Sequence, residues 1–247
     1  MNDSLKNLSP LDGRYQNKTE RSRELFSEFA LIKQRINVET QWLNYFLTNF
    51  KPELLTEKIE EKINTLHTTI PNSLIERVKE IENTTNHDVK AVELAVAEQF
   101  EESEEIQSLV HIFLTSEDIN SLSYALMLKE AHPMLLDCIE NIIQALEDLA
   151  EKNKEVAMLA RTHGQPASPT TLGKELNVFV TRLKKEKRSL RDKKFYAKWG
   201  GATANFNPHL LAYPQEDWIK HSKEFLSNFG VKLTKVATQI EPHDYMA

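Results

Sequence analysis

The chain has 247 residues and a formal net charge of −6 at pH 7, from 31 lysines and arginines against 37 aspartates and glutamates. This acidic balance disfavours nucleic acid and acidic membrane surfaces as principal partners. With 40% hydrophobic residues the chain can bury a core, and 6 glycines and 9 prolines are too few for many short strands and tight turns. No apolar run approaches the length of a membrane span, residues 1–6 hold no apolar signal region, and the lone cysteine excludes an intrachain disulfide. We therefore expect a soluble, cytoplasmic, all-α protein.

Helical periodicity follows a loop at residues 9–15 with the sequence SPLDGRY. Apolar residues recur near every 3.6 positions, which predicts helices over 25–46, 59–66, 74–81, 89–100 and 106–113. Three polar stretches are typical of the capping boxes that start helices: Asn72 or Ser73 with Glu76, Thr85 with Asp88, and Thr115 with Asp118. The acidic residues 97–105 indicate a solvated boundary. We accordingly predict an N-terminal helical domain, 1–108, and the first, incomplete part of a helical-bundle domain, 109–247.

The longest helical pattern runs from Glu117 to Lys152. Its apolar stripe resumes in phase after Pro133, which predicts a bend rather than an end, and it includes Cys138, which we expect to be buried. A helix of this length measures roughly 50 Å at 1.5 Å per residue. No monomeric core of this size needs such a rod. Long rods pack in bundles, often across subunits, so we expect this helix to do the same.

A polar turn at 161–169 separates this helix from the next one, predicted over 172–190. Pro166 and Pro169 stop the preceding helix, and His163 stands on the stiff turn before them. The basic residues in 182–198 indicate a solvated helix face in preference to a nucleic-acid site.

The last part of the chain contains a loop of small residues and an unfinished element. The loop at 200–208 is a place where a ligand could approach the backbone, and a short helix carries Trp218 and Phe225. Pro242 is the expected first position of a further helix. Because the chain stops about one turn into that helix, we expect it to be a piece of a longer protein.

Five polar clusters place donor or titratable groups at helix ends: Arg14-Tyr15, Asn86-His87-Asp88, Thr115-Ser116, Thr162-His163 and Gln239. None has the spacing of a metal site, and the sequence has no phosphate-binding glycine loop and no Gly-x-Ser-x-Gly nucleophile elbow. His163 is either an ordinary member of a connector or a proton carrier aimed by its turn. His87 likewise either belongs to a simple helix start or helps free N–H groups there to bind an anion. Such a donor-rich set suits an anionic substrate handled by proton transfer, without a metal or nucleotide cofactor.

The segments SPLDGRY, TTNHDVKAVE, TSEDIN, RTHGQPASPTT and TQIEPHDY resemble, in the same order, those of the bacterial adenylosuccinate lyase family, in the fumarase/aspartase superfamily. RTHGQPA indicates only the superfamily, whereas TTNHDVKAVE and SPLDGRY narrow the resemblance, which covers essentially all 247 residues. It implies a fumarase/aspartase-like helical fold and no cofactor. It also implies β-elimination of fumarate from adenylosuccinate, giving AMP, and from succinyl-aminoimidazole-carboxamide ribotide, both in purine biosynthesis. The implied partners are these small purine nucleotides and three further copies of the chain, in a homotetramer whose active sites each draw on three subunits.

The resemblance also implies roles for individual residues. His163 is the general acid that gives a proton to the leaving nitrogen. His87 binds substrate anions together with Arg14 and Tyr15, and it is the alternative candidate for the acid. Thr115 and Ser116 contact the succinyl part, and the remaining members of the substrate-binding set are Asn86, Asp88, Thr162 and Gln239.

One feature of that family is missing from this sequence. The family's catalytic base is a serine in a mobile loop of the form SSxMPxKxNP, expected well beyond residue 247. Elimination needs both an acid and a base, so we expect the 247-residue chain alone to be inactive. Two other interpretations stay open: another lyase of the superfamily, such as argininosuccinate lyase, and a non-catalytic helical structural module.

Overall fold

The computed structural model describes residues 7–246, and most of them are helical. The all-α expectation is confirmed, since the strands among these residues form only two small two-stranded sheets. The chain divides into two compact units: unit 1 comprises Met1–Lys129 and Lys194–Ala247, and unit 2 comprises Glu130–Lys193. The domain boundary at 108/109 stays a prediction. Residues 1–6, where the sequence shows no signal region, lie outside the described part, and no helix within it is long and apolar enough to cross a membrane.

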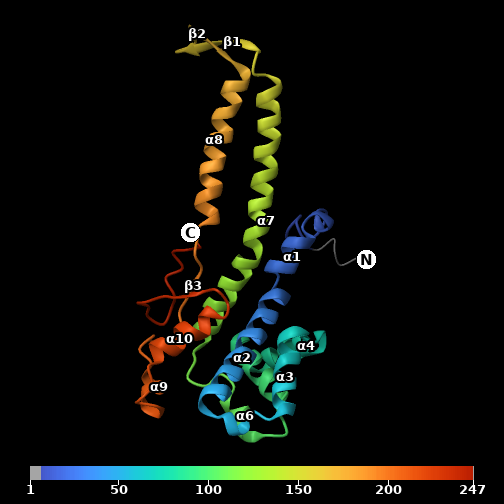
Figure 1. Cartoon of the computed structure of the whole chain (residues 1–247). Helices are drawn as coiled ribbons and strands as arrows, with labels where there is room; N and C mark the ends of the chain where they lie inside the picture. Colours follow the sequence, from blue (N-terminus) through green and yellow to red (C-terminus); the bar gives the residue numbers. More distant parts are fainter. Residues whose placement is uncertain (1–6, 247) are drawn as a thin grey trace. The chain divides into compact units, whose positions relative to one another are not determined.

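Unit 1 contains the N-terminal helices, the beginning of the longest helix and the C-terminal segment (Figure 1). Its elements in chain order are η2 (Gln16–Lys18), α1 (Glu20–Phe26), α2 (Glu28–Phe50), η3 (Pro52–Leu54), α3 (Glu57–Thr68), α4 (Asn72–Thr85), α5 (Asp88–Glu98), α6 (Glu104–Leu109), the start of α7 (Ser116–Lys152), β3 (Tyr196–Ala197), α9 (Asn207–Ala212), α10 (Trp218–Ser227) and β4 (Lys232–Leu233). The predicted helix over 25–46 is divided at Ser27, because its hydroxyl accepts a hydrogen bond from the Ala30 N–H (3.2 Å) and starts α2 there. The capping box predicted at Asn72 or Ser73 is wrong, since Pro71 precedes α4 and no side chain caps that helix.

The core of unit 1 is organised around α2. Trp42 and Phe46 of α2 are buried together with Trp199 and Phe225, which come from much later in the chain. The ring of Trp42 lies 5.3 Å from that of Trp199 and 5.1 Å from that of Phe225, measured between ring centroids. Fully burying one such side chain stabilises the fold by about 1.5–3 kcal/mol. This packing holds the segment after Lys194 against α2.

The C-terminal segment of unit 1 forms a turn in place of the helix predicted at Pro242. The Met246 N–H donates to the His243 carbonyl (2.9 Å), and the turn covers residues 244–246. The imidazole of His243 lies between two carboxylates, with Nε2 3.2 Å from Glu117 Oε1 and Nδ1 3.1 Å from Glu241 Oε2. A single helical turn gains too little to repay its nucleation, so these polar contacts determine the local structure.

Unit 2 is a pair of helices capped by a β-hairpin (Figure 1). The part of α7 from Glu130 onward lies beside α8 (Leu172–Arg191), and Lys187 of α8 pairs with Glu140 of α7 at 2.6 Å. Between the helices, β1 (Ala157–Thr162) pairs antiparallel with β2 (Gln165–Thr171). The polar turn predicted at 161–169 is thus the tip of this hairpin, which the sequence did not predict.

The conformation of the hairpin tip explains this difference. His163 and Gly164 form a two-residue loop, and both have positive φ, +50° and +76°. Positive φ at both positions is the pattern of a type I′ turn, whose twist matches that of two paired strands. Pro166 and Pro169 are compatible with β2 because an edge strand needs no N–H from them.

The apolar stripe of α7 lies exposed within unit 2. Leu135, Ile142 and Leu149 are 45%, 53% and 48% exposed, whereas Ile143 and Ala150 are buried. Cys138 is exposed too, so the prediction of a buried thiol is wrong. Among the described residues of this unit, α8 is the only helix beside α7, and one neighbour cannot cover the whole stripe. Pro133 lies inside α7, as the resumed stripe predicted.

Candidate active site

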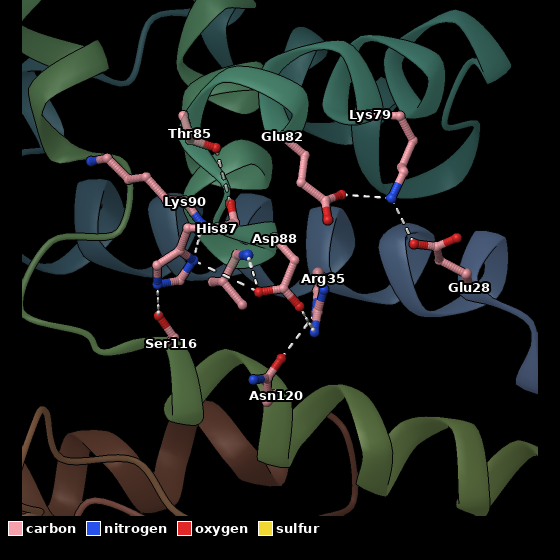
Figure 2. Close-up of polar contacts among 11 residues, drawn as sticks. Glu28, Arg35, Lys79, Glu82, Thr85, His87, Asp88, Lys90, Ser116 and Asn120 are labelled. Atoms are coloured by element: carbon pink, nitrogen blue, oxygen red, sulfur yellow. Dashed lines mark hydrogen bonds and ion pairs between the residues drawn. The ribbon is translucent and has the colours of Figure 1, made fainter.

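The cluster around His87 forms where α4 ends and α5 begins. Asn86 adopts a left-handed conformation (φ +51°) that ends α4, and His87 then serves as the N-cap of α5. Nδ1 of His87 accepts a hydrogen bond from the Lys90 N–H at 3.2 Å (Figure 2). The predicted box from Thr85 to Asp88 is therefore wrong, because Thr85 belongs to α4, where its hydroxyl donates to the Ile81 carbonyl (3.2 Å). The histidine itself does the capping.

The cap determines which nitrogen of His87 carries a proton. A nitrogen that accepts from a backbone N–H needs its lone pair, so the neutral ring carries its proton on Nε2. Nε2 lies 3.5 Å from the Ser116 hydroxyl oxygen, at the start of α7 (Figure 2). His87 and Ser116, predicted separately, are therefore brought together.

A buried arginine supports this cluster. Arg35 of α2 is only 4% exposed, and its guanidinium contacts Asp88 Oδ2 at 2.7 Å and Asn120 Oδ1 at 2.9 Å (Figure 2). Burial raises the pKa of Asp88, but the Arg35 charge and the hydrogen bond from the Val89 N–H outweigh it and hold that pKa below its ordinary value. Sequence reasoning missed Arg35 and Asn120. The available signal was a cation between Ile32 and Ile36 on the apolar face of a helix.

Thr115 lies beside the same cluster. Its backbone N–H donates to Asp118 Oδ2 at 2.9 Å, which is one of the two reciprocal bonds of the predicted capping box from Thr115 to Asp118. Gly200 and Gly201, in the loop at 200–208, donate their N–H groups to the same carboxylate, at 3.0 and 3.1 Å. These amides are therefore occupied, and the expectation that a ligand approaches the backbone there is not met at these two residues.

An open pocket of about 420 Å³ adjoins the His87 cluster. Its lining includes the carboxylates of Glu28, Glu82 and Asp88, and the positive charges near them belong to Arg35 and to Lys79, which bridges Glu28 and Glu82 at 2.7 Å each (Figure 2). Three negative charges against two positive ones make this pocket a poor anion site. The groups that suit an anion lie at its edge, where the side chains of Asn86 and His87 are exposed, whereas the Asn86 backbone N–H is occupied by the Glu82 carbonyl (2.8 Å).

The other predicted residues of unit 1 lie in loops. Arg14 is exposed, with its guanidinium carbon 5.8 Å from the centre of the Tyr15 ring. No hydrogen bond among residues 7–246 joins this pair to the His87 cluster. Gln239 is also exposed, on a bend, and the nearby Glu241 N–H donates to Glu117 Oε1 at 3.2 Å. That contact ties the Gln239 segment to the residue after Ser116.

Thr162 and His163 belong to unit 2, at the hairpin tip, and both are exposed. Within the described part of the chain the His163 ring makes no hydrogen bond or ion pair. Its position on a type I′ turn leaves both ring nitrogens accessible to solvent. The predicted donors thus divide between the two units, with His163 and Thr162 in one and the remainder in the other. Among residues 7–246, no three or more His, Cys, Asp or Glu side chains are arranged so that they could hold a metal ion.

Comparison with known proteins gives a consistent family. Residues 13–247 match the protein family described as lyase. The chain belongs to this lyase family. Adenylosuccinate lyases from Legionella pneumophila (strain Corby), Haemophilus influenzae and Escherichia coli (strain K12) are 44%, 42% and 40% identical to it over 99%, 98% and 99% of its length. The resemblance inferred from the motifs is therefore confirmed, and the chain spans about half, 55%, of the length of each of these relatives.

Solved structures agree on the fold of this lyase-family chain. A fumarate lyase from Mesorhizobium sp. BNC1 superposes with a TM-score of 0.71 at 18% identity, over 88% of this chain and 49% of that one. The β-carboxy-cis,cis-muconate cycloisomerase from Acinetobacter calcoaceticus sp. ADP1 gives 0.70 at 18% identity, over 92% and 52%. At such identities the likeness concerns the fold alone, and it confirms the expected fumarase/aspartase-like helical architecture.

Proposed function

We propose that this chain is part of an adenylosuccinate lyase that releases fumarate from adenylosuccinate, giving AMP, and from succinyl-aminoimidazole-carboxamide ribotide. The observation that carries the proposal is the 40–44% identity to adenylosuccinate lyases along 98–99% of the chain. The cluster of His87, Thr115 and Ser116 supports it, because residues predicted from two separate motifs meet at one place in unit 1.

The reaction needs two proton transfers. A base removes a proton from the carbon next to the C–N bond, the electron pair of that C–H bond forms the double bond of fumarate, and the C–N bond breaks. An acid then gives a proton to the departing nitrogen. We propose His163 as the acid, because an exposed imidazole on a two-residue turn can approach a substrate without losing any contact of its own. Thr162 and Gln239 contact the substrate in this proposal.

His87 takes a different role from His163. Its Nδ1 is committed to the Lys90 N–H, so it offers the substrate an Nε2–H donor on a neutral ring. A neutral imidazole is a good hydrogen-bond donor but a very weak acid. We therefore propose that His87, with Asn86, Arg14 and Tyr15, binds the anionic groups of the substrate. Thr115 and Ser116 bind the succinyl carboxylates, and Asp88 holds Arg35 in place.

Assembly and location belong to the same proposal. Homotetramer formation would cover the exposed Leu135, Ile142 and Leu149 on α7, and large exposed apolar patches of this kind mark interaction surfaces. We propose a cytoplasmic homotetramer that uses no cofactor. Light scattering of the full-length protein tests the tetramer, and cell fractionation tests the location.

The central experiment follows the ultraviolet absorbance of adenylosuccinate with two proteins, the full-length gene product and the 247-residue chain alone. We expect the full-length protein to convert it to AMP and fumarate. The 247-residue chain should leave it unchanged, because its sequence has no serine-base motif. A full-length protein that cleaved argininosuccinate instead, or neither compound, would contradict the proposal.

A further inference from the structure

A buried ion pair lies next to Thr115. Asp118 in the first turn of α7 and Lys198 after β3 both have fully buried side chains, 0% exposed, and Asp118 Oδ1 is 2.8 Å from Lys198 Nζ. No local sequence pattern predicts this pair, because the capping box explains Asp118 alone and Lys198 belongs to a basic run that is expected to be solvated.

The Asp118 carboxylate accepts four hydrogen bonds, two on each oxygen. Oδ1 accepts from Lys198 Nζ (2.8 Å) and the Gly200 N–H (3.0 Å), and Oδ2 accepts from the N–H groups of Thr115 (2.9 Å) and Gly201 (3.1 Å). A carboxylate offers about four acceptor positions, so all of them are filled. A protonated carboxyl would set its own O–H against one of these donors, so the four donors favour the ionised form, although burial raises the pKa of this carboxyl above its ordinary value.

Stability alone does not account for such a pair. Removing two charges from water is costly, and apolar side chains of similar volume often stabilise a fold at least as well. The pair fixes the relative position of two segments that lie about 80 residues apart in the chain. Lys198 Nζ also donates to the Gly201 carbonyl (2.7 Å), and the Lys198 N–H donates to Ser121 Oγ (3.1 Å).

We propose that Asp118 and Lys198 are positioning residues of the candidate active site. Their ion pair fixes the backbone at Thr115, and through it the Ser116 hydroxyl that lies 3.5 Å from His87 Nε2. The kinetic consequence rests on the proposed lyase function, whereas the structural consequence does not.

The structural consequence is tested by NMR on the 247-residue chain. In the wild-type chain, the ¹³C signal of the Asp118 carboxyl should be that of an ionised group at pH 7. In Asp118→Asn, the amide protons of Thr115, Gly200 and Gly201 should all move upfield together, because each loses a hydrogen bond to a charge. The ring signals of His87 should change as well. Those of His163, which lies in unit 2, should not.

The kinetic consequence is tested in the full-length protein with Lys198→Met. We expect kcat/KM for adenylosuccinate to fall about 10²-fold, mainly through KM, because misplaced hydroxyls hold the bound substrate poorly. Lys62→Met is the matched control, since Lys62 Nζ also donates to one carboxylate, Glu102 (2.9 Å), and one carbonyl, Gln99 (2.6 Å). This control should keep the wild-type kcat/KM.

The double variant Asp118→Asn/Lys198→Met separates positioning from charge compensation. It contains no unpaired buried charge, so its unfolding midpoint should recover relative to Lys198→Met, while kcat/KM should stay low. Recovery of kcat/KM to the wild-type value would overturn the proposal.

Two further results would overturn it: a protonated Asp118 in the wild-type chain at pH 7, which needs no variant, and a folded Lys198→Met enzyme with unchanged kcat/KM. A wild-type full-length protein without lyase activity would instead contradict the proposed function, and the NMR measurements would still decide the positioning role.

Discussion

Nδ1 of His87 accepts a hydrogen bond from the Lys90 N–H at 3.2 Å, so the imidazole completes the first turn of α5. One residue thus has a structural and a chemical function, and the two use different ring nitrogens. Nδ1 caps the helix, and Nε2 points toward Ser116 and any ligand beside it (Figure 2).

The first prediction separates these functions by substitution at His87. Asparagine is a favoured N-cap residue, so His87→Asn should keep the stability of the wild-type chain within a few tenths of a kcal/mol, whereas His87→Ala should lose about 1 kcal/mol. Both should reduce kcat/KM in the full-length protein, because both remove the Nε2–H donor. Urea unfolding and steady-state kinetics measure the two effects.

Ser27→Ala provides the control for this pair of variants. Ser27 caps α2 at the same 3.2 Å, so its removal should cost similar stability without affecting kcat/KM. Full activity in His87→Asn would show that capping is the only role of His87.

The second prediction concerns His163. His163→Asn should preserve the hairpin, because Asn-Gly is the most favourable pair for a type I′ turn. In the full-length protein it should nevertheless reduce kcat by at least ~10²-fold, a typical general-acid contribution. Gly164→Ala should have the opposite effect on the hairpin. An added Cβ would have no atom within 4 Å, but alanine is strained at the φ of +76° that this residue adopts. It should weaken the hairpin, as measured by amide hydrogen exchange in β1 and β2. Near-wild-type kcat in His163→Asn would remove His163 from its proposed role.

The third prediction concerns acid stability and His209. This side chain is fully buried among Phe113, Phe206 and Trp218, and its ring nitrogens have no hydrogen-bond partner among the described residues. Burial, helped by the Lys198 charge, lowers its pKa from 6.5 to about 4. Between these pH values the unfolded chain binds a proton that the folded chain does not. Stability should therefore fall as the pH drops from 6.5, by about 3 kcal/mol once it reaches 4, and not further below that.

His209→Leu isolates this effect. The variant should lose the part of the pH dependence that falls between pH 6.5 and 4, while other acid-sensitive groups act equally in both proteins. All three tryptophans lie in unit 1, so urea unfolding followed by tryptophan fluorescence reports on the unit that contains His209. Identical pH dependence in the two proteins would show that His209 is accessible to protons in the folded state.

The fourth prediction concerns Arg35. In Arg35→Met the pKa of Asp88 should rise, because the charge that lowers it is removed while the burial that raises it remains. A carboxyl whose folded pKa is depressed stabilises the fold above its unfolded pKa and loses that contribution on acidification. The variant should therefore lose less stability than the wild type below about pH 4. Titration of the Asp88 carboxyl by ¹³C NMR measures the shift. Arg77→Met is the control, since Arg77 pairs with Glu98 (2.9 Å) and should leave Asp88 unchanged.

The sequence by itself determined what depends on neighbours along the chain. Apolar spacing predicted α2 to α5, the continuation of α7 past Pro133, and α8, because burial on one helix face repeats with the helical period. The motifs around Arg14, His87, Ser116, His163 and Gln239 indicated a lyase, because each is a short continuous segment that can be recognised without knowing the fold.

Only the tertiary structure decided which groups meet. Arg35 contacts Asp88 and Asn120, and Asp118 contacts Lys198, across separations of tens of residues that no local pattern encodes. The burial of Lys198 and the exposure of Cys138 also reversed sequence expectations, because burial depends on which other segments cover a face. At the hairpin tip, positive φ at His163 allows β1 and β2 to pair. The two prolines had indicated only a turn between helices. Local periodicity is enough to predict the helices, whereas the partners of a buried charge depend on the path of the whole chain.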